Sequence, residues 1–184
     1  MEREGYITLE FNDKNINTDL LKEMRNFLLS IPCICFKNVK FFKFDTKLFP
    51  ETISSILKSL PLIQDNIYND EFINNIDKIN VTFSAYNNYD EPILIKSEKN
   101  LIGVETVGNF PILWLDSKQE IKCVLKFQVS NAIENANYSA VSLITYYQQN
   151  KKWYLKFYNM GLHKNEKILE FFDSKFKNIN YKII

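Results

Sequence analysis

The sequence predicts an α+β fold, and three observations lead to that prediction. Apolar residues recur at helical spacing in two segments near the ends, residues 17–32 and 164–178. Several stretches between them alternate apolar and polar residues, as strands do. The regular alternation of strands and helices that builds a doubly wound parallel sheet is missing. A chain of 184 residues fits one domain, or two small ones that share a core.

A strand at residues 6–11 (YITLEF) is followed by the first predicted helix. Asn17 or Thr18 caps this helix, because a short side-chain oxygen accepts a free backbone N–H of the first turn. Asp19 suits the positive end of the helix, and Pro32 cannot extend it. The helix has a broad apolar face, made of Leu20, Leu21, Met24, Phe27, Leu28 and Ile31.

The middle of the chain is predicted to be mostly strands. Residues 33–44 (CICFKNVKFFKF) indicate an extended segment with Val39, Phe41 and Phe42 directed inward. A short helix follows Pro50, and residues 64–79 are polar and ambiguous. Further strands are expected at 80–86, 93–96, 101–107, 120–129, 140–148 and 153–158.

The last predicted helix covers residues 164–178. Its apolar positions fall on one side, at Ile168, Leu169, Phe172, Phe176 and Ile179. The segment is also rich in lysine, but nearby acids offset part of that charge, so we interpret the lysines as a solvated helix face.

The overall charge argues against nucleic-acid binding. The chain has 23 basic and 22 acidic side chains, which gives a formal charge of +1. Proteins that hold nucleic acid alone usually carry a basic excess, because phosphate neutralisation supplies most of the affinity. We therefore expect no direct contact with nucleic acid.

The cysteines and the hydropathy predict an intracellular, reducing location. Cys33, Cys35 and Cys123 are odd in number, and a single residue between the first two is poor spacing for zinc. We interpret all three as buried thiols in strands. No secretory signal opens the sequence, and no apolar run approaches the ~18 residues of a membrane span. We expect neither a metal nor membrane association.

The sequence contains no recognisable catalytic motif. Phosphate-binding glycine loops and the nucleophile elbow of hydrolases do not occur. The one histidine, His163, lacks an obvious partner for acid–base catalysis apart from Glu166, which is also an ordinary acid for a helix start. Asp90 and Glu91 lie in a turn signal before Pro92, where solvation explains them. We expect no catalytic residues and no cofactor, although an enzyme centred on His163 stays open as a hypothesis.

Three segments, taken in order, resemble the alpha-like subunits of multisubunit RNA polymerases. That family includes the amino-terminal domain of bacterial alpha, its archaeal counterpart and the third-largest subunit of eukaryotic polymerase II. Residues 24–32 (MRNFLLSIP) are similar to its arginine-containing hydrophobic run that ends in proline. Residues 44–62 (FDTKLFPETISSILKSLPL) resemble its acid, short helix and I-P-L pattern. In residues 110–147 the positions Gln119, Ala136, Ser139 and Val141 match.

The closing part of the chain extends the resemblance, and several positions depart from it. WYLKFYNMGL followed by ILEFF is similar to the family's closing strand and dimerisation helix. Asn26 stands at the second arginine of the family pair, and Asn135 at its histidine. Ser55 and Ile56 replace a His-Arg pair, and the cysteine cluster of some members is missing. The resemblance with these departures suggests a divergent lineage, such as a large DNA virus.

The resemblance implies a discontinuous dimerisation domain, a sheet plus two helices, from residues 1–49 and 150–184. Residues 50–149 would form an inserted β-rich domain. It also implies a non-catalytic assembly subunit of a DNA-dependent RNA polymerase, a transcription complex whose catalysis belongs to other chains. The compartment would be the cytoplasm or virion for a virus, with the nucleus as the alternative.

The resemblance further implies partners. A smaller alpha-like subunit would form a heterodimer with this chain, which we favour over a homodimer, and the two largest polymerase subunits would dock on the pair. We expect the two terminal helices to leave apolar faces that another chain completes, and Arg25 to help dock a large subunit. The partner-binding residues are Leu20, Leu21, Met24, Arg25, Phe27, Leu28, Ile168, Leu169, Phe172 and Phe176. The alternative is a free-standing α+β protein-binding module, for example a viral protein that binds a host factor.

Overall fold

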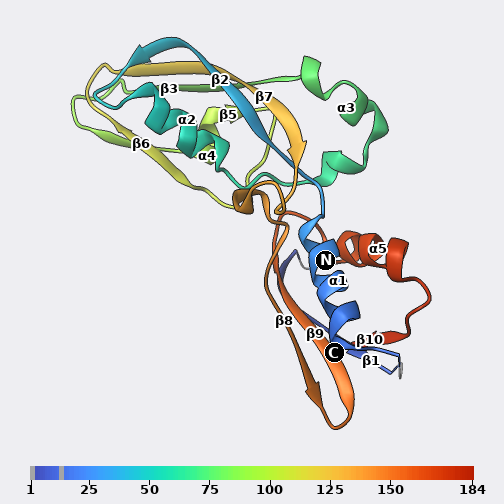
Figure 1. The fold of residues 1–184 in the computed structure, drawn as a ribbon. Coiled ribbons are helices and arrows are strands. Elements are labelled where there is room, and N and C mark those ends of the chain that lie inside the picture. The colour runs from blue at the N-terminus through green and yellow to red at the C-terminus, as the bar shows by residue number, and fades with distance from the viewer. Residues whose placement is uncertain (1–2, 13–14) are drawn as a thin grey trace. The chain divides into compact units, whose positions relative to one another are not determined.

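The computed structural model describes residues 3–12 and 15–184 and contains both helices and strands in several sheets (Figure 1), which confirms the α+β class. The chain divides into two compact units. The terminal unit comprises Met1–Cys33 and Ser130–Ile184, and the central unit comprises Ile34–Val129.

The boundaries between the two units differ from the domain boundaries that the sequence predicted. Strand β2 (Cys33–Asp45) belongs with the central sheet, where its neighbour is β7 (Glu120–Ser130). Strand β8 (Val141–Gln149) pairs with β9 (Lys152–Met160) in the terminal sheet. The boundaries between the units thus lie after residues 33 and 129, instead of after 49 and 149.

The terminal unit is built on a four-stranded antiparallel sheet in the order β10-β1-β9-β8. Strand β1 (Glu4–Phe11) pairs along its whole length with β9, from Glu4 opposite Met160 to Phe11 opposite Trp153. The short β10 (Tyr181–Ile183) pairs with the other edge of β1. Both ends of the described chain thus lie in one sheet.

Two helices cover one face of this sheet, α1 (Thr18–Leu29) and α5 (Asn165–Phe176). As expected, Asn17 caps α1: its side-chain oxygen accepts hydrogen bonds from the backbone N–H groups of Asp19 at 3.1 Å and Leu20 at 2.9 Å. Phe172 of α5 packs edge-on against Tyr181, and Tyr181 lies opposite Phe11 on β1. Residues opposite each other in neighbouring strands share a face, so α5 lies over the apolar face of β1.

The central unit contains a four-stranded sheet in the order β2-β7-β3-β5, with β3 at Asn80–Tyr86 and β5 at Leu101–Ile102. A two-stranded sheet joins β4 (Ile93–Lys96) to β6 (Pro111–Leu115). Helix α2 (Pro50–Lys58) adds Ile53 and Leu57 to the same core. The remaining helical segments are short: α3 (Asp70–Asn74), α4 (Ser97–Asn100) and 3-10 turns at Asp65–Tyr68, Ile76–Lys78 and, in the terminal unit, Ala136–Tyr138.

Some expectations for the central unit are corrected. Phe42 is 63% exposed and does not point inward, because β2 places it on the same side as Lys40 and opposite to Phe41, which is partly buried against the core. The strand expected at residues 101–107 is only the two-residue β5. Strand β6 was not expected, and the ambiguous stretch 64–79 forms the short helical turns named above.

Candidate partner-binding surface

The chain itself buries six of the ten residues that we expected a partner to cover. Leu21, Met24, Leu28, Ile168 and Phe172 are each 0% exposed, and Phe176 is 5% exposed. Their burial needs no other chain, so the expectation that these six side chains form an interface is corrected. They are core residues of the terminal unit.

The two helices cover each other as well as the sheet. The ring of Phe27 stacks on that of Phe171 with centroids 4.6 Å apart, and meets the edge of Phe176 at 5.4 Å. Lys175 Nζ lies 2.8 Å from Glu23 Oε1, which adds an ion pair between the helices. The sheet covers one side of each helix, and the neighbouring helix covers a second side.

Four of the expected partner-binding residues keep exposed area. Leu20, Phe27 and Leu169 are half-buried, and Arg25 is exposed. Leu20 and Phe27 are seven residues apart, so they lie on one side of α1. Arg25 is turned about 160° away from Phe27, by the 3.6-residue period of the helix. The structure therefore does not bring Arg25 and the remaining apolar positions into a single patch.

A tyrosine-rich face of the terminal sheet was missed from the sequence. On the side opposite the helices, Tyr6 meets the edge of Tyr158 with ring centroids 5.0 Å apart, and Lys156 Nζ lies 4.2 Å from the Tyr6 ring centre. Tyr147 stacks on Tyr154 at 5.0 Å. The alternation in YITLEF and WYLKFY was the signal that could have found it, because every second residue of a strand faces the same side.

A hydrogen-bonded charge cluster lies on the same face. Glu10 is 7% exposed and accepts hydrogen bonds from Lys152 Nζ at 2.8 Å and from the Tyr154 hydroxyl at 3.0 Å. These two bonds lower the pKa of Glu10, and Lys182 adds attraction at 4.0 Å. The bond to Glu10 raises the pKa of Lys152 and of Tyr154. The cluster holds β1, β9 and β10 together on their solvent side.

His163 lies inside the terminal unit. It is 1% exposed, and its Nε2 lies 3.7 Å from Cys33 Sγ. The Asn159 side chain donates a hydrogen bond to the His163 carbonyl at 3.0 Å, which holds the turn before α5. All three cysteines are buried, as the sequence predicted.

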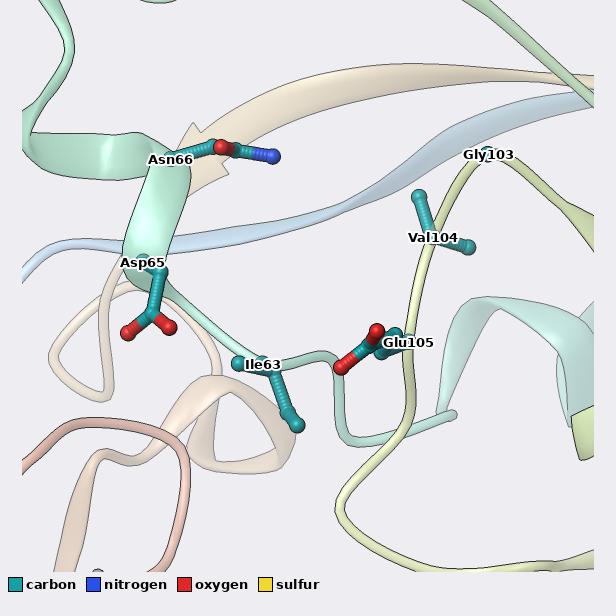
Figure 2. A pocket seen from close by; sticks show the side chains of 6 residues that line it. All are labelled: Ile63, Asp65, Asn66, Gly103, Val104 and Glu105. Atoms are coloured by element: carbon teal, nitrogen blue, oxygen red, sulfur yellow. The ribbon is translucent and has the colours of Figure 1, made fainter. Parts of the chain in front are cut away.

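The central unit has a pocket of about 440 Å³ beside residues 63–66 and 103–105. Figure 2 shows carboxylates from two separate segments there, Asp65 and Glu105, with the side chain of Ile63 between them in that view. Within residues 3–12 and 15–184, no group of three or more histidine, cysteine or acidic side chains is placed to hold a metal ion. Two carboxylates without a nucleophile or a third ligand do not define a reaction.

Neither a scan of protein-family models nor a search of curated proteins finds a match to this chain. In the part of the chain that the structure describes, no helix is both long and apolar enough to cross a membrane.

Proposed function

We propose that this chain is a non-catalytic assembly subunit of a DNA-dependent RNA polymerase, which pairs with a smaller alpha-like chain and docks the two largest subunits. One observation carries the proposal beside the resemblance in the sequence. The two ends of the chain build a sheet with two helices on one face, and a β-rich unit is inserted between them. That discontinuous organisation is the one that the resemblance implies.

The burial of the helix cores limits where partners would bind. Leu20, Phe27 and Leu169 would provide the apolar contact with the smaller chain, because they keep exposed area on α1 and α5. Arg25 would contact a large subunit from another side of α1. A partner would then add to a terminal unit that is already packed, and would not complete an open core.

Co-purification from the native source tests the proposal. A tagged chain should recover large polymerase subunits together with a small partner. The substitution Arg25→Glu should weaken recovery of a large subunit while leaving the fold intact, because Arg25 is exposed. Lys99→Glu, an exposed position in α4 of the central unit, is the matched control. Failure to recover any polymerase subunit under conditions that preserve complexes would refute the proposal.

A free-standing protein-binding module is the second candidate, and the self-coverage of α1 and α5 favours it. A chain that buries its own helix cores should be monomeric and stable alone. Light scattering gives the oligomeric state of the purified chain, and co-purification identifies what it binds. A stable monomer that recovers a partner unrelated to polymerase would establish the protein-binding module.

A further inference from the structure

One face of the central sheet is covered and the other is open. The inward residues of β7, from Ile121 to Phe127, are buried in the same core as Ile53 and Leu57 of α2. The alternate residues of β7 from Glu120 to Gln128 and those of β3 point to the opposite side and are exposed or half-buried, as are Asn38, Lys40 and Phe42 of β2. We call this side the open face.

Lysines gather on the open face. Lys122 and Lys126 lie on β7, opposite Ser84 and Asn80 of β3, and Lys40 is exposed on the neighbouring β2. The outward positions of β3 are uncharged: Asn80, Thr82, Ser84 and Tyr86. Glu120 is the acid among the outward positions of β7, and it lies at the far end from Lys126. The face is therefore basic although the whole chain is nearly neutral.

An exposed aromatic ring lies among these charges. Phe42 is 63% exposed, with Lys40 Nζ 5.5 Å from its ring centre. A shallow groove of about 480 Å³ runs beside it and is lined by Asn38, Lys40, Phe42, Asn80, Val124 and Lys126. An exposed ring beside lysines can bind one ligand in two ways: the ring stacks on it, and the lysines attract its negative charge.

We propose that the open face binds a single strand of nucleic acid. A base would stack on Phe42, the amides of Asn38 and Asn80 would face base edges, and Lys40 and Lys126 would neutralise phosphates. Lys122 and Lys126 are separated by about 13 Å along β7, from the rise of a strand, so the positive charge extends along the sheet. Such platforms combine stacking with backbone neutralisation and are tolerant of sequence.

This proposal goes beyond the polymerase assignment and does not depend on it. It uses residues of the central unit alone, whereas the assembly role uses α1 and α5. It also differs from the expectation drawn from net charge. The expectation used the net charge of the whole chain. The local charge differs, because strand alternation places three lysines on the open face of the central sheet.

Fluorescence anisotropy on the full chain tests the proposal, with a labelled single-stranded RNA of about 12 nucleotides, within the site sizes of stacking platforms. Wild-type protein should bind at low salt, with a log–log salt slope that loses about 0.7 for each phosphate-contacting lysine removed. Lys126→Ala should reduce the slope in this way. Phe42→Ala should weaken binding about tenfold, because it removes the stacked base. DNA of the same sequence and a duplex form two further arms, which report whether the sugar matters and whether single strands are preferred.

Matched controls lie in the same unit. Lys96→Ala removes an exposed lysine from β4, and Tyr89→Ala removes a ring that is 69% exposed in the turn before β4. Both variants should bind like the wild type. Absence of binding at low salt, unchanged binding by the Phe42 and Lys126 variants, stronger binding of the duplex, or equal competition by polyglutamate would each overturn the proposal.

Discussion

The ring of Phe27 on α1 stacks on the ring of Phe171 on α5 with centroids 4.6 Å apart and planes 14° from parallel. This contact joins two helices that are far apart in the sequence. It shows that each helix is covered by the other as well as by the sheet.

The Phe27–Phe171 contact predicts a coupling that can be measured. A double-mutant cycle with Phe27→Ala and Phe171→Ala should give a coupling free energy of about 0.5–1.5 kcal/mol in urea unfolding. The pair Phe27 and exposed Tyr89 lies in different units and should show no coupling. Additive effects of Phe27→Ala and Phe171→Ala would mean that the stack contributes no stability.

The burial of the helix cores predicts the stability of the chain alone. Met24→Ala and Phe172→Ala should each lower the free energy of unfolding of the purified chain by about 2–5 kcal/mol, because each removes a fully buried side chain. Leu28→Asp should unfold the terminal unit and is therefore unsuitable as an interface variant. Arg25→Ala should change stability by less than about 0.5 kcal/mol. If Met24→Ala were harmless in the free chain and damaging only in a complex, a partner would have to cover this residue.

The charge cluster around Glu10 predicts a pH dependence. Hydrogen bonds from Lys152 and Tyr154 lower the folded-state pKa of Glu10 below 4.5, so the folded state holds its proton less tightly than the unfolded state. The resulting stability is present above pH 4.5 and is lost as the pH falls through the folded pKa. Glu10→Gln should therefore be less stable than the wild type at pH 7, and the gap should narrow below pH 4.5. Urea unfolding at a series of pH values measures the difference in free energy of unfolding between the two proteins. A difference that does not change with pH would contradict the lowered pKa of Glu10.

The buried thiol of Cys123 is predicted to react slowly with alkylating reagents. Burial in the central sheet raises its pKa from 9.0 to about 12, because a thiolate is poorly solvated there. Iodoacetamide at pH 8 should alkylate Cys123 at least about a hundredfold more slowly in the native chain than in urea, since the thiolate is the reactive form. Mass spectrometry of the Cys123 peptide gives the rate. Stability should also fall above pH 9, where only the unfolded state ionises this thiol, and Cys123→Ala should remove that alkaline component.

Local patterns predicted most elements because local physics decides them. Leu21, Met24 and Leu28 recur at three- and four-residue spacing and form the buried side of α1. Asn17 caps the helix, as its short polar side chain predicted. Residues 120–129 form the expected strand, and Cys123 is buried in it as predicted. These signals act within a few residues and need no distant partner.

Other features carry no local signal. Strand β10 has three residues and exists because β1 offers it an edge. Gln64 is 1% exposed. Its side chain accepts a hydrogen bond from the Ile34 N–H and donates one to the Ile34 carbonyl. Ile34 is 30 residues away, so the sequence around Gln64 does not predict this pairing. Phe42 was expected inside because it is apolar, but the phase of β2 turns it outward.

The sequence by itself determined that this chain has amphipathic helices near both ends, strands between them and buried thiols, because periodicity and capping depend on neighbouring residues. Only the tertiary structure decided what covers the helices and where the lysines gather. Both depend on which strands become neighbours and which helix lies beside which, and those pairings join residues such as Phe27 and Phe171 across more than a hundred positions of the chain.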